Sequence, residues 1–121
     1  MILGLRTVVY PVADLDAAKA WYSNVLGFEP YFDQPFYVGF AVGGFELGLI
    51  PDGKPSVDGT QAYWGVADVH AASARLAELG ATSDGGVQDV GGGILAAKFL
   101  DPFGNVFGII SNPHFDLNAV R

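Results

Sequence analysis

Apolar residues recur at three- and four-residue spacing in two stretches of this chain. Residues 12–28 read VADLDAAKAWYSNVLGF, and residues 66–81 read VADVHAASARLAELGA. The spaced apolar positions are Ala18, Trp21, Tyr22, Val25 and Leu26 in the first stretch and Val69, Ala72, Leu76 and Leu79 in the second. This spacing is typical of a helix with one apolar face. Because both stretches open on Val-Ala-Asp and close near Leu-Gly, we predict two similar units in tandem.

The residues at the ends of both stretches mark where the helices begin and end. Asp14 and Asp68 stand where a side-chain oxygen accepts from unpaired backbone N–H groups of the first turn. Gly27 and Gly80 stand where a left-handed residue ends a helix. We therefore predict one short helix between each pair.

The remaining apolar runs are short and separated by glycine and proline, which is typical of strands and tight turns. The expected strands cover residues 3–12, 29–33, 36–42 and 45–50 in the first unit and 61–66, 87–90, 94–100 and 105–110 in the second. In the first strand, alternation puts Thr7 and Val9 on one face and Tyr10 and Val12 on the other.

This order predicts an α+β fold of two tandem βαβββ units. A single unit would leave one sheet face bare, so we expect the two sheets to pair into one curved mixed sheet, with helices outside and a concave cavity inside. The 121 residues read as one domain: unit one at about 3–50, a linker at 51–60, unit two at about 61–110 and a tail at 111–121.

The composition argues against a membrane protein, a secreted protein and a nucleic-acid-binding protein. No apolar run approaches the roughly 20 residues of a membrane span. Arg6 follows the first apolar residues instead of preceding them, and no cysteine is present, so we expect no secretory leader and a cytoplasmic location. The net charge is −7 and the basic residues are scattered, which argues against nucleic acid as a partner.

Four stretches resemble the vicinal oxygen chelate superfamily, which includes glyoxalase I, extradiol dioxygenases, fosfomycin-resistance transferases and bleomycin-resistance proteins. They are residues 12–28, their copy at 66–81, FELGL at 45–49 and DPFGNVFGII at 101–110. The resemblance implies the same paired βαβββ fold. It does not define one activity, because the superfamily hosts many chemistries.

The resemblance also implies where a divalent metal would bind. In metal-dependent members the ligands follow the pattern His or Gln, Glu, His and Glu. Here the corresponding residues are taken as Thr7, Glu46, Gln61 and Gly108. Because Gly108 has no side chain and Thr7 is a weak ligand, we expect no tightly bound metal and no other cofactor. A divalent metal stays open as the alternative.

Alternation also predicts which residues face the cavity. Glu46 shares a face with Gly48, and Gln61 shares one with Tyr63, so these side chains point inward, whereas Trp64 packs under the second helix. Four further aromatic residues either line the mouth of a pocket or form a dimer seam: Phe36, Tyr37, Phe40 and Phe103.

We therefore expect a metal-free protein that binds an apolar or aromatic small molecule, with Glu46 and Gln61 as polar anchors and Tyr63 as an aromatic wall. The alternative is a lyase, isomerase or dioxygenase of the same superfamily, with a divalent metal or with Glu46 as general base. A third possibility is a collapsed cavity in a partner-binding module. The apolar content of 50% favours a homodimer.

Overall fold

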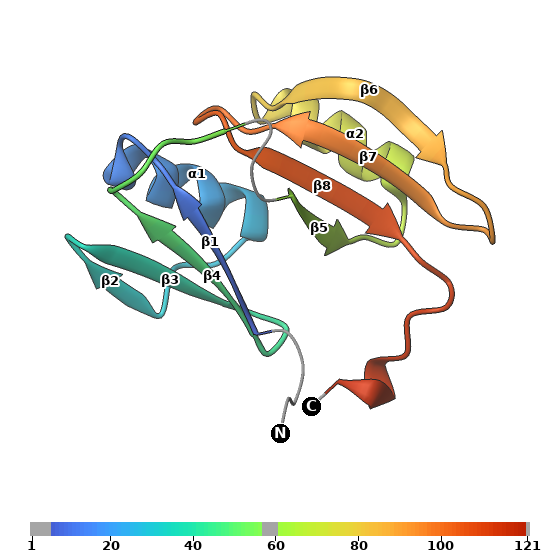
Figure 1. The fold of residues 1–121 in the computed structure, drawn as a ribbon, viewed down its shortest axis with the longest axis horizontal. Helices are drawn as coiled ribbons and strands as arrows, with labels where there is room; N and C mark the ends of the chain where they lie inside the picture. The colour runs from blue at the N-terminus through green and yellow to red at the C-terminus, as the bar shows by residue number, and fades with distance from the viewer. Residues whose placement is uncertain (1–5, 57–60, 121) are drawn as a thin grey trace. The chain divides into compact units, whose positions relative to one another are not determined.

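The computed structural model describes residues 6–56 and 61–120. Its strands form two four-stranded sheets, and the chain divides into two compact units, Met1–Pro55 (unit 1) and Ser56–Arg121 (unit 2) (Figure 1). Each unit follows the order βαβββ. The predicted α+β fold of two tandem βαβββ units is confirmed, whereas their pairing into one curved sheet around a cavity stays a prediction.

Unit 1 places its first strand beside its last. Its elements are β1 (Thr7–Pro11), α1 (Leu15–Leu26), β2 (Phe32–Gln34), β3 (Tyr37–Val42) and β4 (Phe45–Ile50). The sheet order is β1-β4-β3-β2, with β1 parallel to β4 and the other pairs antiparallel. In this register Thr7 lies opposite Glu46, and Gly39 lies opposite Gly48.

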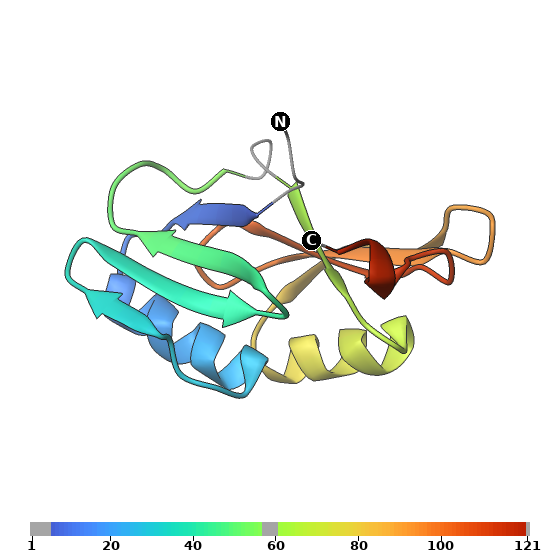
Figure 2. The ribbon, with the colours of Figure 1, turned by 90° about the horizontal axis from the view of Figure 1, so that it is seen from below.

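One face of the unit 1 sheet is the core, and α1 lies along it (Figure 2). The buried residues are Tyr10, Val12, Ala18, Tyr22, Val38, Phe40, Leu47 and Leu49. The rings of Tyr10 and Tyr22 lie 6.2 Å apart between strand and helix. Burying each large apolar side chain contributes about 1.5–3 kcal/mol. The predicted faces are confirmed, because Tyr10 is buried while Thr7 is exposed.

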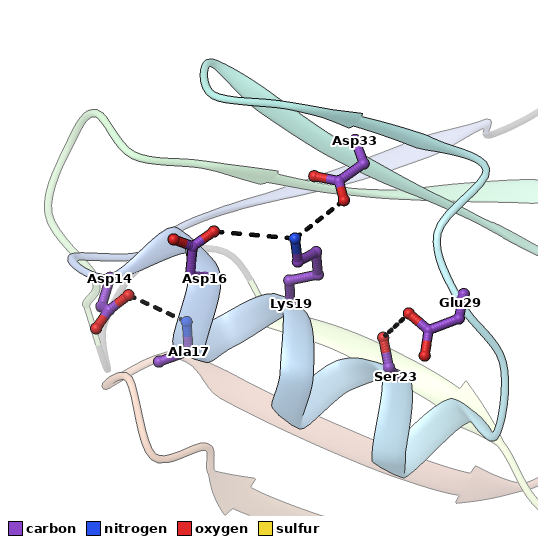
Figure 3. Close-up of polar contacts among 7 residues, drawn as sticks. All are labelled: Asp14, Asp16, Ala17, Lys19, Ser23, Glu29 and Asp33. Atoms are coloured by element: carbon purple, nitrogen blue, oxygen red, sulfur yellow. Dashed lines mark hydrogen bonds and ion pairs between the residues drawn. The ribbon is translucent and has the colours of Figure 1, made fainter.

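The polar side of α1 is tied to its surroundings by side chains (Figure 3). Asp14 accepts from Ala17 N at 3.0 Å, as predicted for an N-cap. Gly27 ends the helix with φ of 82°, the left-handed conformation that glycine adopts without strain. Lys19 Nζ donates to Asp33 Oδ2 at 2.9 Å and so links the helix to β2.

Unit 2 repeats this arrangement. Its elements are β5 (Gln61–Gly65), α2 (Val69–Glu78), β6 (Thr82–Asp89), β7 (Leu95–Leu100), β8 (Val106–Ser111) and the 3₁₀ helix η1 (Leu117–Ala119). The sheet order is β5-β8-β7-β6, and α2 lies along one face of it (Figure 2). Its core includes Ala62, Val69, Leu76, Ala97, Phe99, Phe107 and Ile109.

Two predicted strands differ from the structure. The strand expected at 87–90 begins earlier, at Thr82, because Gly85 and Gly86 do not end it but sit where its register shifts between Asp84 and Gln88. Both glycines have positive φ, and such an irregularity bends a strand without ending it. The strand expected at 29–33 is reduced to β2. No helix within residues 6–56 and 61–120 is long and apolar enough to cross a membrane.

Candidate functional site

Two tyrosine hydroxyls converge on one carboxylate in unit 1. Tyr31 Oη donates to Glu46 Oε1, and Tyr37 Oη donates to Glu46 Oε2. Glu46 lies on β4 next to the buried Leu47, so strand alternation directs it to the sheet face opposite α1. We call these three residues the Tyr-Glu-Tyr cluster. It lies on the face that the sequence predicted for ligand binding.

A pair of glycines makes room for the tyrosine rings. Gly39 and Gly48 lie opposite each other in β3 and β4. A Cβ at Gly48 would stand 2.7 Å from Tyr37 Cζ, and a Cβ at Gly39 would stand 3.1 Å from Tyr37 Cε1 and 3.3 Å from Tyr31 Cε1. The rings therefore lie against bare backbone, and side chains at these positions would displace them.

The cluster fixes the protonation of its members. Hydrogen bonds from Tyr31 and then Tyr37 lower the pKa of Glu46, against an opposing effect of desolvation. Burial, followed by the hydrogen bond to Glu46, raises the pKa of Tyr37 to about 12. The hydrogen bond to Glu46 also raises the pKa of Tyr31. Near neutral pH the cluster is one carboxylate held by two neutral phenols. Glu46 is thereby a weaker base than an ordinary glutamate.

The cluster borders a hollow in the surface of unit 1. The hollow has a volume of about 290 Å³ and is lined by Arg6, Thr7, Tyr31, Ala41, Gly44, Phe45 and Glu46. The predicted site residues Thr7 and Glu46 therefore both line this hollow. Tyr31 was not predicted as a site residue: the sequence placed it in a strand expected at 29–33, whereas it lies in a bend before β2. Its backbone N–H, donating to Gly39 O at 3.0 Å, brings it beside the sheet.

Exposed aromatic rings continue from the cluster along β2. The Phe32 ring lies 6.5 Å from that of Tyr31, 6.0 Å from that of Tyr37 and 6.1 Å from that of Phe36. Tyr31 and Phe36 are 63% and 66% exposed. The choice between pocket mouth and dimer seam for Phe36 stays open. Phe40, by contrast, is wrongly predicted as a rim residue, because it is buried on the α1 face.

The other predicted site residues belong to unit 2. Gln61 is exposed at the start of β5, and Tyr63 is 46% exposed with its ring against Gly108. Phe103 is half-buried in the β7–β8 turn, where its backbone N–H donates to Asp101 Oδ1 at 2.9 Å. That these residues join Glu46 in one cavity stays a prediction.

The register changes the assignment of the metal-ligand positions. Thr7 lies opposite Glu46, and Gln61 opposite Val106, so Glu46 corresponds to Val106 in the second unit. Gly108 lies opposite Tyr63, two residues further along, and its counterpart in unit 1 is Gly48. Pairing Glu46 with Gly108 as equivalent ligand positions was therefore wrong. If Gly108 marks the position in β8, the position in β4 is also a glycine.

The residues present do not fit a divalent metal. Tyrosine rings cover both glycines, and a Cβ at Gly108 would stand 2.6 Å from Tyr63 Cδ1 and 2.8 Å from Ala62 O. Both oxygens of Glu46 already accept a phenol hydrogen bond. Within residues 6–56 and 61–120, no three His, Cys, Asp or Glu side chains gather as a metal site would require.

A second hollow, of about 560 Å³, lies at the start of α1. Its acidic lining residues are Asp14, Asp16 and Asp33. Asp14 caps the helix and Asp33 pairs with Lys19, so both carboxylates have a structural role. The Tyr-Glu-Tyr cluster is the stronger candidate because its carboxylate lies beside exposed aromatic rings.

Two tandem units, each a four-stranded sheet with one helix, define an α+β protein of the tandem βαβββ class. The sequence profile of the Glyoxalase/Bleomycin resistance protein/Dioxygenase superfamily matches residues 4–109, and the chain belongs to this superfamily. The resemblance seen in the sequence is thereby confirmed. Among curated proteins, none matches this sequence significantly.

Solved structures share the fold at low sequence identity. A glyoxalase-related enzyme from Fulvimarina pelagi superposes with a TM-score of 0.78 at 19% identity, covering 98% of this chain and 95% of its own. A superfamily member from Sphaerobacter thermophilus DSM 20745 gives 0.74 at 24%, covering 93% and 99%. A lactoylglutathione lyase from Agrobacterium tumefaciens gives 0.74 at 20%, covering 93% and 98%. At such identities the similarity establishes the fold alone.

Proposed function

We propose that this protein binds a small planar molecule without a metal, and that the Tyr-Glu-Tyr cluster of unit 1 is the polar anchor of its site. The observation that carries the proposal is the convergence of Tyr31 and Tyr37 on Glu46 beside an exposed row of rings. Ligand sites typically combine apolar and aromatic walls with a few fixed polar groups. In the fuller site that we expect, Gln61 and Tyr63 of unit 2 add a second anchor and a second ring.

An enzyme of the same superfamily remains the competing proposal. A lyase such as the one from Agrobacterium tumefaciens shares the fold. The alternative in which Glu46 is a general base is disfavoured by its lowered pKa, because a base acts best when its pKa lies near the working pH. The metal-dependent alternative is disfavoured by the glycines at 48 and 108, which supply no ligand.

Binding of a neutral planar probe tests the proposal. Acridone titrated into the protein should change its fluorescence saturably. Tyr31→Ala should weaken that binding about tenfold or more, since stacking on an aromatic ring contributes about 0.5–1.5 kcal/mol and the anchor is also lost. Phe115→Ala is the matched control, because Phe115 in the C-terminal tail is also 63% exposed. Absence of saturable binding, or equal losses in the two variants, would count against the site.

We also propose that the chain forms a homodimer. Large apolar side chains remain exposed within the single chain, among them Val9, Phe28, Phe36 and Val90. Exposed apolar patches commonly mark interfaces. Sedimentation at micromolar concentration should show a dimer, and a monomer would contradict this proposal without bearing on the ligand site.

A further inference from the structure

We infer that the ligand of the Tyr-Glu-Tyr cluster is a planar cation whose N–H groups donate to Glu46. This inference rests on the proposed function and adds the charge and hydrogen-bonding class of the ligand. Amidines and protonated nitrogen heterocycles belong to this class.

Hydrogen-bond counting gives the first argument. An ionised carboxylate is acceptor-only and offers about four lone-pair positions. The hydroxyls of Tyr31 and Tyr37 occupy two of these positions. Each phenol has one O–H, which it donates to Glu46, so it has no further donor for a ligand. What the cluster still offers is therefore lone pairs, on the carboxylate and on the phenol oxygens. A ligand that matches it must bring donors.

The preference for positive charge follows from the state of Glu46. The two phenols stabilise the ionised carboxylate, and a hydrogen bond between opposite charges is roughly twice as strong as a neutral one. A carboxylate or phosphate ligand would instead meet like charge and oxygen lone pairs. The net charge of −7 for the whole chain acts in the same direction at longer range.

The rings beside the carboxylate favour a cation that is flat. Tyr31, Phe32 and Phe36 lie in a row with ring centroids 6.1–6.5 Å apart. All three are at least 38% exposed, so their faces and edges are open to a ligand. A cation close to the face of an aromatic ring is attracted by the ring's negative face. A planar cation thus contacts the rings and the carboxylate together.

Arg6 is the basic residue to be considered, because it also lines the hollow. Lys19 lies on α1, on the other face of the sheet, and its Nζ is 2.9 Å from Asp33 Oδ2. Because Arg6 carries a positive charge at the hollow that it lines, it acts against the binding of a cationic ligand. Arg6→Gln should therefore tighten the binding of a cation and leave that of a neutral probe unchanged. This effect is opposite in direction to the one expected for Glu46→Gln.

Three tricyclic probes of similar shape test the inference: the aminoacridine cation, neutral acridone and the anthracene carboxylate anion. We expect aminoacridine to bind at least tenfold more tightly than acridone, and anthracene carboxylate to bind most weakly. Glu46→Gln should remove the advantage of aminoacridine while acridone binding changes little. Tyr31→Phe, which keeps the ring and frees a lone pair of Glu46, should preserve the advantage. Added salt should reduce it, as expected for an exposed charge.

The outcomes separate the two proposals. If acridone binds and aminoacridine binds no better, or if Glu46→Gln leaves their ratio unchanged, the inferred charge class is wrong and the proposed binding function stands. If anthracene carboxylate binds most tightly, the site selects anions and the inference is overturned. If none of the three binds saturably, the proposed function fails and the inference fails with it. Circular dichroism of each variant establishes that the fold is retained.

Discussion

The phenol ring of Tyr37 lies across the backbone of Gly48, with Cζ 2.7 Å and Cε2 2.8 Å from where a Cβ at residue 48 would stand. Real side chains essentially never approach a Cβ so closely, so only glycine allows this ring position. The hydroxyl of the same ring donates to Glu46. The absence of a side chain at residue 48 therefore allows the contact that orients the Glu46 carboxylate, two residues away on the same face of β4.

Gly48→Ala should therefore disturb the cluster as well as the stability. The three atoms nearest to the added methyl belong to Tyr37, and overpacking of this kind costs about 1–3 kcal/mol. Urea unfolding should show the loss. Gly65→Ala is the matched control, because Gly65 is also in a strand and a Cβ there meets nothing within 4 Å.

Removing the ring should relieve the strain. In Tyr37→Ala, the additional change Gly48→Ala should cost less than it does with Tyr37 present, because the three atoms nearest to a Cβ at residue 48 belong to Tyr37. Double-mutant unfolding measures this coupling. Additive costs of Tyr37→Ala and Gly48→Ala would show that the ring does not occupy this position.

The tyrosine hydroxyls of the Tyr-Glu-Tyr cluster should lose their protons at a higher pH than an ordinary tyrosine. The pKa of Tyr37 is raised from 10.0 to about 12, first by burial and then by the hydrogen bond to Glu46. Because the folded chain holds this proton more tightly than the unfolded chain, the stabilisation is complete below pH 10 and is lost as the pH rises towards 12. Ultraviolet absorbance of phenolate should resolve Tyr37 as one late step, and Glu46→Gln should move that step to lower pH.

Glu46 makes the stability of the fold depend on pH in the acidic range. Its pKa is lowered from 4.5, so its share of the stability is present above that pH and is lost as the pH falls through the lowered pKa. Carboxylate NMR shifts of Glu46 should show a midpoint below 4.5, and Tyr31→Phe with Tyr37→Phe should raise it. A midpoint above 4.5 in the unmodified protein would contradict the hydrogen-bonded cluster.

The sequence predicted the fold well because local signals and tertiary packing agree. Both N-caps, Asp14 and Asp68, accept from the backbone as expected, and the alternation in β1 matches its burial. The predictions from the sequence were wrong where the position of a residue depends on strand register or on a bend. Gly85 is a turn residue by composition, yet the paired strand β7 continues past it.

The candidate site was predicted only in part for the same reason. Alternation placed Glu46 on the correct face, but its partners come from β3 and from the bend before β2. Tyr31 reaches Glu46 because of how β2 pairs with β3, and no local pattern encodes that pairing. Counting along the last strands also set Glu46 equal to Gly108, whereas the register shows an offset of two residues. That offset depends on pairing with β1 and β5.

Adjacent aromatic residues of β5 should behave differently. Trp64 stacks on the buried Phe107 with centroids 5.2 Å apart and an interplanar angle of 8°. Trp64 is half-buried, so Trp64→Ala should destabilise unit 2 by about 3 kcal/mol, the lower end of the range for truncating a large core ring. Tyr63→Ala, at a ring 46% exposed, should cost less. Thermal unfolding of the two variants makes the comparison, and equal costs would contradict the assigned faces.

Trp64→Phe should be far milder than Trp64→Ala. Among the residues that the structure describes, the buried Nε1 of Trp64 has no hydrogen-bond partner. Phenylalanine removes this N–H and keeps a ring against Phe107, and a buried unpaired donor itself costs about 1–3 kcal/mol. A loss in Trp64→Phe as large as that in Trp64→Ala would show that the N–H is hydrogen-bonded after all.

Added zinc or nickel should not stabilise this protein. Tyrosine rings cover Gly48 and Gly108 in the last strands of the two units, and the oxygens of Glu46 already accept from two phenols. Thr7 and Gln61 alone would leave an ion most of its water shell. A metal at a hundredfold excess over its Kd would add about 2.7 kcal/mol to the free energy of unfolding. We expect no such shift in Tm, and isothermal titration should show only weak binding.

Adding metal-ligand side chains by substitution should not create a tight metal site. Gly108→Glu brings a carboxylate, but its Cβ would stand 2.8 Å from Ala62 O as well as against Tyr63, so removing that ring relieves only part of the clash. Thr7→His, Gln61→His and Gly108→Glu together should therefore lower stability without gaining tight zinc binding. Elemental analysis of the dialysed, unmodified protein is the decisive measurement, because near one equivalent of a transition metal per chain would overturn the metal-free proposal and favour the lyase or dioxygenase alternative.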